Sequence, residues 1–356
     1  MNRGLVALAV LLAFAGGGAI LWFAARTQPH TPPAPESGQP SGVTAKDEAL
    51  APTGPVRQRL WRHTRPGRPT PVTSVCFSPD GKTLASAGGG LKFWDVAADK
   101  ELASPPSDDA NYVAFSPDGN TLAWGGNHFA ITVWDVRGRK QLFLLHGTDQ
   151  GPVTGLSFSP DGKVLASSHD AWNARLWDVE AGREKAILKG PPTSYRSVHF
   201  RKDGKIVVTA DQMGTRLWDV ATGKVRSLEA DGGRNVTAAY FSPDGQTVAS
   251  GNDVYGLALW DMATEKKNTP FRSSSGAVFA LCFSPDGKTL AAAEASKQRD
   301  GEPRIVLWDV VTGGERLTLP ADQLMTYCLQ FSPDGKSLAC GNADGTVAVW
   351  ELKPVE

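Results

Sequence analysis

The sequence predicts an all-β domain in which seven four-stranded antiparallel sheets form a closed ring. The motif Phe-Ser-Pro-Asp-Gly occurs six times, at 77–81, 115–119, 158–162, 241–245, 283–287 and 331–335, and a diverged seventh copy lies at 200–204. Each copy is followed, mostly 17 to 19 residues later, by a tryptophan: Trp94, Trp134, Trp177, Trp218, Trp260, Trp308 and Trp350. Seven copies with a period near 42 residues are typical of a repeat array, in which these tryptophans have a structural role.

The composition restricts the possible functions. The chain has 356 residues with 37 Lys and Arg and 37 Asp and Glu, so its formal net charge is zero. A general nucleic-acid binder normally has a basic surplus, and we therefore expect no nucleic-acid partner. The 38 glycines and 25 prolines suit many short strands joined by tight turns.

An apolar segment at residues 4–25 predicts a single N-terminal transmembrane helix. It contains no charged residue and is flanked by Arg3 and Arg26. A helix of this length spans the hydrocarbon core of a bilayer. The alternative is a cleaved signal peptide, because Leu5–Phe14 resembles an h-region and 17–19 are small residues. We favour an uncleaved signal anchor, because the apolar run continues through Ile20–Phe23.

The predicted location follows from this anchor and the segment after it. Residues 27–55 are rich in Pro, Ser and Thr and predict a disordered linker. The charges on the two sides of the anchor slightly favour an extracytoplasmic position for the rest of the chain. We therefore expect a single-pass membrane protein; the alternative is a secreted or periplasmic protein produced by signal cleavage.

The third unit shows how each repeat forms one sheet. Val153–Phe158 alternates between apolar and small or polar residues, as a half-buried strand does. Ser159–Gly162 predicts a turn, because proline presets φ and glycine accepts the left-handed conformation. Val164–Ser168, Ala174–Asp178 and Glu184–Leu188 are the next three strands. Each unit is thus predicted to be a four-stranded meander.

The two ends of the array are predicted to close the ring together. The last unit stops just after Trp350, at its third strand. Before the first unit, Val56–His63 is strand-like but belongs to no unit of its own. We predict that this segment is the fourth strand of the last sheet, because closure removes the exposed ends of the array.

The repeats carry a family resemblance. Units that end in Leu-Trp-Asp-Val, such as Leu217-Trp-Asp-Val-Ala-Thr-Gly223, resemble WD40 repeats, in particular the bacterial kind with Ser-Pro-Asp-Gly at the first hairpin. The resemblance covers residues 56–353. It implies a seven-bladed β-propeller that serves as a scaffold for protein–protein interaction, with a protein partner of unknown identity.

The sequence departs from the WD40 pattern at one network. Family members often have a histidine before the first strand that bonds to a Ser or Thr, an Asp and the blade tryptophan. Here a histidine stands at that place only at His63 and His146. For the third blade, the resemblance implies a network of His146, Ser168, Asp170 and Trp177.

No residue pattern indicates catalysis, a cofactor or a metal. The turn and strand-end aspartates recur once per blade, which indicates a structural role. The six histidines show no metal-ligand spacing, and no nucleophile elbow or phosphate loop is present. Cys76 and Cys282 are expected to be core thiols, whereas Cys328 and Cys340 lie roughly opposite each other across a hairpin and leave a disulfide open.

Candidate binding residues lie where the repeat pattern is broken. The sixth unit contains a charged insertion at 294–303, which includes Lys297 and Arg299. Other bulky side chains at the same end of the predicted ring occur singly: Phe129, Trp172, Tyr195, Met213 and Tyr255. Interface hot spots favour such side chains.

Two other functions remain open at this point. A small-ligand or enzymatic propeller would use unlike polar residues on the inner strands, which here read as Ala, Gly, Val and Ser. A structural envelope component is the other alternative.

Overall fold

The computed structural model describes residues 57–65, 68–147, 151–170, 173–228, 235–254, 256–268, 271, 276–295, 303–320 and 325–352. The predicted anchor at 4–25 and the predicted linker at 27–55 lie outside these residues. Within the described residues, no helix has the length and apolar character that a membrane span requires.

The described residues form seven sheets of four antiparallel strands, here called blades one to seven. The first strands are β4 (Ser74–Phe77), β8 (Tyr112–Phe115), β12 (Val153–Phe158), β16 (Tyr195–Phe200), β20 (Val236–Phe241), β24 (Ala277–Phe283) and β28 (Thr326–Phe331). The second strands are β5 (Thr83–Ala87), β9 (Thr121–Gly125), β13 (Val164–His169), β17 (Ile206–Asp211), β21 (Thr247–Asn252), β25 (Thr289–Ala295) and β29 (Ser337–Asn342). The third strands are β6 (Leu91–Asp95), β10 (Ala130–Asp135), β14 (Asn173–Asp178), β18 (Gly214–Asp219), β22 (Gly256–Asp261), β26 (Arg304–Asp309) and β30 (Thr346–Glu351). The fourth strands are β7 (Lys100–Leu102), β11 (Lys140–His146), β15 (Arg183–Lys189), β19 (Val225–Ser227), β23 (Lys267–Asn268), β27 (Glu315–Pro320) and β1 (Arg57–Arg62).

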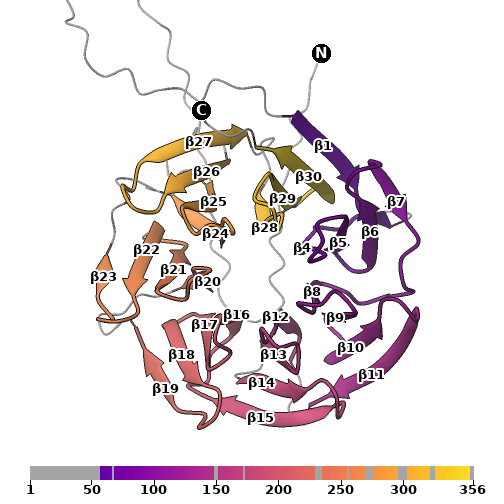
Figure 1. Ribbon diagram of the computed structural model, residues 1–356, viewed down its shortest axis with the longest axis horizontal. Coiled ribbons are helices and arrows are strands. Elements are labelled where there is room, and N and C mark those ends of the chain that lie inside the picture. Colours follow the sequence, from indigo (N-terminus) through magenta and orange to yellow (C-terminus); the bar gives the residue numbers. More distant parts are fainter. Residues whose placement is uncertain are drawn as a thin grey trace, which may run out of the picture. The chain divides into compact units, whose positions relative to one another are not determined.

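The blades are arranged around a ring axis, with their first strands innermost (Figure 1). Each first strand contacts the first strand of the next blade, including β28 of blade seven and β4 of blade one. The short strands β2 (Thr64–Arg65) and β3 (Arg68–Pro69) form a separate hairpin. In the described residues, seven clusters of buried apolar side chains fill the seven spaces between neighbouring blades. This confirms the predicted seven-sheet ring.

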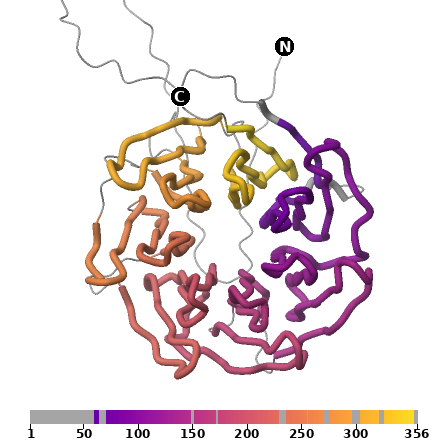
Figure 2. Tube along the Cα trace, viewed as in Figure 1, coloured from indigo at the N-terminus to yellow at the C-terminus, as the bar shows by residue number. Residues whose placement is uncertain are grey.

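The ring closes through its two ends, as predicted. The N-terminal strand β1 pairs with β30 along its whole length, from Arg57 opposite Glu351 to Arg62 opposite Thr346. In the Cα trace, the indigo start of the described chain therefore lies beside its yellow end (Figure 2). Because the fourth strand of blade seven comes from the opposite end of the chain, this blade cannot form without both ends.

The Ser-Pro-Asp-Gly hairpins follow the predicted turn chemistry. In blade one, the Ser78 hydroxyl donates to Asp80 at 2.6 Å, and the Gly81 N–H donates to the Ser78 carbonyl at 2.8 Å. Gly81 has a φ of 70°, which a side chain would strain. The hairpin glycines also pack against the preceding blade: a Cβ on Gly81 would lie 3.6 Å from Cδ of Pro333. The repeated motif therefore links neighbouring blades as well as turning the chain.

The cysteines of blade seven form no disulfide. Cys328 lies opposite Gly341, and Cys340 lies opposite Leu329, because a bulge at 326–328 shifts the register. Consistent with this register, Cys328 packs in the core between blades seven and one, whereas Cys340 packs between blades six and seven. Neither thiol takes part in a disulfide.

Candidate interaction surface

One end of the propeller carries the turns that differ most between blades. We call it the rim surface; it consists of the turns between second and third strands and of the segments that enter the first strands. The opposite end carries the hairpins between first and second strands, which read Ser-Pro-Asp-Gly in six blades and Arg-Lys-Asp-Gly in blade four. Because a binding site must differ from the repeated framework, the rim surface is the candidate interaction surface.

Phe129 occupies a strained position on this surface. It lies in the turn between β9 and β10, its side chain is half-buried, and its φ is 66°. The register of strands β29 and β30 aligns it with Gly345 of blade seven, which has a φ of 82°. A left-handed conformation costs a non-glycine residue about 1–2 kcal/mol. Blade two therefore places a bulky aromatic residue where the turn favours glycine.

Two further predicted rim residues, Met213 and Tyr195, differ in their exposure to solvent. Met213, in the turn between β17 and β18, is 54% exposed and is available for contact. Tyr195 is 0% exposed, and its ring packs against Trp218 with centroids 6.1 Å apart. The prediction that Tyr195 faces the rim surface is therefore wrong, because its ring belongs to the core between blades three and four.

Four other predicted rim residues, Trp172, Tyr255, Lys297 and Arg299, lie outside the described residues.

The predicted network of blade three forms from different residues. Trp177 donates its indole N–H to Ser167 at 2.8 Å, and His169 hydrogen-bonds to the same hydroxyl at 2.8 Å. Side chains alternate along a strand, so Ser167 and His169 share the face of Trp177 whereas Ser168 points to the other face.

The other two predicted members of this network have different environments. His146 is exposed at the end of β11, and Asp170 accepts a hydrogen bond from Ser194. The prediction of His146, Ser168 and Asp170 as partners of Trp177 is corrected accordingly.

The residue that accepts the indole N–H of the blade tryptophan differs from blade to blade. In blade one, both Trp94 and His63 bond to Ser86 at 2.8 Å, as the family pattern implies. The indole N–H groups of the next regular blades donate to Thr209 in blade four and to Ser250 in blade five. Blade two has Trp124 at the acceptor position, with its ring 5.8 Å from that of Trp134. Blades six and seven depart further.

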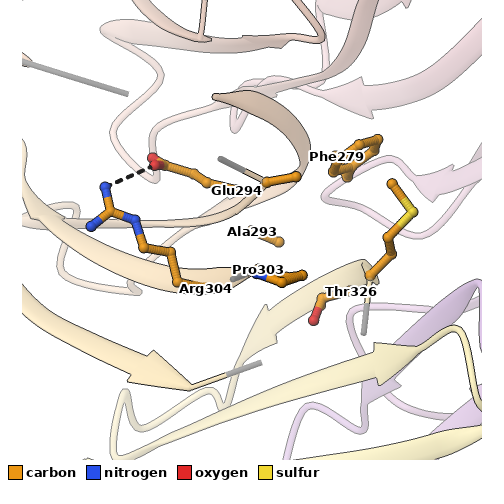
Figure 3. A pocket seen from close by; sticks show the side chains of 8 residues that line it. Phe279, Ala293, Glu294, Pro303, Arg304 and Thr326 are labelled. Carbon is orange, nitrogen blue, oxygen red and sulfur yellow. Dashed lines mark ion pairs between the residues drawn. The ribbon is translucent and has the colours of Figure 1, made fainter. Parts of the chain in front are cut away.

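In blade six, a carboxylate replaces the hydroxyl. Glu294, the penultimate residue of β25, accepts the Trp308 indole N–H at 3.1 Å. Its other oxygen lies 3.5 Å from the Arg304 guanidinium (Figure 3). The Glu294 side chain is 3% exposed and that of Arg304 is 39% exposed. Burial raises the pKa of Glu294 to about 7, and Arg304 opposes that rise only in part.

A small apolar hollow lies beside this pair. Phe279 of β24, Ala293 of β25, Pro303, Met325 and Thr326 line it, so it is shared by blades six and seven. Figure 3 shows the Glu294 carboxylate turned toward Arg304 and away from Phe279. The charged pair therefore forms the edge of this hollow.

Sequence reasoning missed this pair, although a signal existed. Aligning the second strands shows alanine at position 292 where Ser250 stands in blade five, and glutamate two residues later. Sequence reasoning also missed a buried ion pair in blade four, where Arg216 donates to Asp211 at 2.6 Å.

The inner strands carry unlike polar residues. The residue before each repeated phenylalanine is, in chain order, Cys76, Ala114, Ser157, His199, Tyr240, Cys282 and Gln330. Some of these residues link blades: the Phe115 N–H donates to the Cys76 sulfur at 3.4 Å, and the Phe77 N–H donates to Gln330 at 2.5 Å. The expectation of only Ala, Gly, Val and Ser at the inner strands is therefore wrong.

The titratable groups outside blade six fit structural roles. The pKa of Asp80 is lowered, chiefly because the Ser78 hydroxyl donates to its carboxylate, and the same turn recurs around the ring. Burial raises the thiol pKa of Cys76, Cys282 and Cys328, which makes them poor nucleophiles at neutral pH. The described ranges contain no group of three or more His, Cys, Asp or Glu residues suited to a metal ion.

Comparison with known proteins supports the repeat assignment. Residues 61–95, 139–178, 265–309 and 317–351 match the WD40 family model, described as WD domain, G-beta repeat. A stretch of 26 residues is 77% identical to apoptotic protease-activating factor 1 of Mus musculus. That stretch is 7% of this chain and covers 2% of the mouse protein, so the likeness extends over only a small part of either.

The four-stranded blades, their number and their closure define a seven-bladed β-propeller. Four segments of its repeats match the WD40 model, so the chain is similar to WD40-repeat propellers. WD40 propellers commonly bind proteins and are usually non-catalytic scaffolds.

Proposed function

We propose that this chain is a membrane-tethered scaffold that binds a protein partner through its rim surface and has no catalysis of its own. The observation that carries the proposal is Phe129, whose φ of 66° is maintained at a turn where the aligned residue of blade seven is Gly345. Strain of this kind persists where the surrounding structure supports a function. Met213, 54% exposed, adds a second large apolar side chain to the same surface.

The partner is a protein because the rim surface offers apolar and aromatic contacts rather than a basic field. The chain has equal numbers of acidic and basic residues. An aromatic anchor that is already fixed in one conformation loses little entropy on binding, which favours its use as an interface hot spot. Residues 4–25 would hold the propeller at a membrane, and 27–55 would separate the two.

The binding proposal is tested by comparing partner capture at the two ends of the propeller. We expect full-length Phe129→Gly to lose the proteins that co-purify with the wild-type chain while remaining folded. Val311→Ser is the matched control, because Val311 is 83% exposed in a turn at the opposite end of blade six. Capture that survives Phe129→Gly and is lost in Val311→Ser would contradict a rim-surface site.

The membrane proposal has its own test. Protease added to intact cells should cleave the propeller from its anchor if the propeller is extracytoplasmic. The cell pellet should retain the N-terminal fragment. Release of the propeller without detergent or added protease, as a chain that lacks the N-terminal segment, would instead indicate signal cleavage, the secreted or periplasmic alternative.

A small-ligand function is a second candidate because the inner strands carry unlike polar side chains. The rings of His199 and Tyr240, on neighbouring first strands, have centroids 4.8 Å apart. Such residues at non-repeating positions can orient a polar ligand near the ring axis. Native mass spectrometry of the full-length chain would detect a co-purifying molecule that His199→Ala loses. A wild-type mass equal to that of the polypeptide would contradict this function.

A further inference from the structure

Blade six holds its tryptophan through a titratable group. The Trp308 ring lies opposite Leu290, and residues two and four positions beyond Leu290 share its face of the sheet. The nearer residue is Ala292, which has no acceptor, so the indole N–H donates to Glu294 instead. In blade five, Ser250 fills the nearer position and accepts from Trp260 at 3.1 Å.

Glu294 also holds one end of a charged pair across the β25–β26 ladder. Glu294 and Arg304 are directly opposite each other in the last cross-strand pair before the 296–303 connection. The Glu294 carboxylate is buried, whereas the Arg304 side chain is 39% exposed and its guanidinium lies 3.5 Å from Glu294. The only other carboxylate paired with Arg304 in the described residues is Glu315 of β27, 3.9 Å away. The position of Arg304 thus depends largely on the charge of Glu294.

We propose that protonation of Glu294 releases Arg304 toward the rim surface, so that a proton controls the charge that blade six presents to a partner. The pair is neutral when Glu294 is ionised and carries one positive charge when Glu294 is protonated. The Trp308 bond survives in both states, because a carboxylic acid keeps an acceptor oxygen. The fold is therefore retained while the surface changes.

The surroundings of Glu294 favour this response. Phe279 of β24, Met325 and Thr326 of β28 are uncharged and line the adjoining hollow. The charged groups that act on Glu294 are Arg304 of β26 and Glu315 of β27, and Glu315 disfavours a second negative charge. Burial is the largest influence and raises the pKa of Glu294 to about 7, within the range that cells and organelles reach.

Equilibrium unfolding of the full-length chain tests whether Glu294 takes up a proton on folding. A carboxyl group with a raised pKa takes up its proton on folding between its ordinary value of 4.5 and about 7. Across that window, the unfolding constant of the wild type should rise roughly tenfold per pH unit relative to Glu294→Gln. Above pH 7 the unfolding constants of the wild type and of Glu294→Gln should change with pH in the same way. Parallel profiles throughout would overturn the proposal.

A matched pair of variants separates titration from the loss of the tryptophan acceptor. Ala292→Ser supplies the hydroxyl that Ser250 supplies in blade five. Ala292→Ser/Glu294→Gln therefore keeps Trp308 bonded with no titratable group beside it. This double variant should unfold with the pH profile of Glu294→Gln, and Ala292→Ser alone with that of the wild type. A pH response retained in the double variant would place the titrating group elsewhere.

Arginine labelling tests the release. At a fixed pH of about 8, where Glu294 is ionised, phenylglyoxal should modify Arg304 several-fold faster in Glu294→Gln and in the double variant than in the wild type. Arg226, 54% exposed, serves as the internal reference and should not change. Equal Arg304 rates would show that the pair does not restrain the guanidinium. The inference rests on the proposed function, in which the rim surface is the binding face. Because these measurements use no partner, they can contradict the inference without contradicting the proposed function.

Discussion

The indole ring of Trp61 stacks on that of Trp94, with ring centroids 5.1 Å apart and planes within 3°. Trp61 lies on β1, which completes blade seven, whereas Trp94 lies on β6 of blade one. The Trp61 indole N–H also donates to Asp99 of blade one at 2.7 Å. The strand that closes blade seven is therefore fastened to the next blade as well.

The first prediction concerns this closure. Trp61→Ala should destabilise the propeller by about 3–5 kcal/mol, because it removes a buried aromatic ring and leaves a cavity between blades seven and one. Leu60→Ala is the control: Leu60 is the preceding residue of β1 and is 50% exposed, so its loss should change stability little. Chemical denaturation of both variants measures the difference. Equal effects would mean that Trp61 does not fasten the ring.

The second prediction concerns blade seven, whose tryptophan lacks an acceptor. The Trp350 indole N–H is buried without a hydrogen-bond partner, and Cys340 stands where Ser250 stands in blade five. Cys340→Ser should supply the missing oxygen and stabilise the fold by about 1 kcal/mol. Thermal unfolding would detect this as a raised melting temperature.

The reciprocal change in blade five provides the control. Ser250→Ala removes the acceptor of Trp260 and should cost about 1–3 kcal/mol, because a buried donor is left unsatisfied. If Cys340→Ser destabilises the chain as much as Ser250→Ala does, the hydroxyl is not what blade seven lacks.

Local chemistry explains which parts of the fold could be predicted from the sequence. The hairpin at Ser78–Gly81 could be predicted because its hydrogen bonds join residues within the turn. Ser78 bonds both to Asp80 and to Gly81. The closing strand could be predicted because Val56–His63 is strand-like but belongs to none of the seven repeat units. Both inferences need only residues that are close in sequence or a count of strands.

The site was less predictable because it depends on side-chain direction. The sequence predicts Tyr195 on the rim surface, yet a bulge between Tyr195 and Ser197 alters the alternation of side chains, and the ring of Tyr195 lies in the core. The resemblance implies Ser168 as the partner of Trp177, whereas Ser167 makes the bond, because the pairing of Leu165 with Trp177 puts Ser167 on the face of the tryptophan. Glu294 became recognisable only when its strand was set opposite Trp308.

The third prediction uses the strain at Phe129. Phe129→Gly should stabilise the propeller by about 1 kcal/mol, because glycine adopts a φ of 66° without steric cost. The reciprocal change, Gly345→Ala, should destabilise it, since φ is 82° and a Cβ would lie 2.9 Å from the Thr70 carbonyl oxygen. Denaturation midpoints compare the two. A stability loss in Phe129→Gly would show that the ring contributes more by packing than its backbone strain costs.

The fourth prediction concerns acid sensitivity in blade three. His169 is 3% exposed and bonds to Ser167 and to the Gly151 carbonyl, and burial lowers its pKa to about 4. The folded state therefore excludes a proton that the unfolded chain binds below pH 6.5. Stability should fall as the pH drops from 6.5 toward 4, by roughly 1.4 kcal/mol per pH unit for this one group.

Replacing the imidazole isolates that contribution. His169→Gln should lose stability at pH 7.5, where the native hydrogen bonds are missing, yet show a shallower decline between pH 6.5 and 4. His128→Gln is the matched histidine replacement at the surface, because the His128 side chain is 79% exposed on the rim surface. Equilibrium denaturation at intervals across this range gives both slopes. If His169→Gln declines as steeply as the wild type, the proton taken up on unfolding belongs to another residue, and the Ser167–His169–Trp177 network stabilises blade three without making it sensitive to acid.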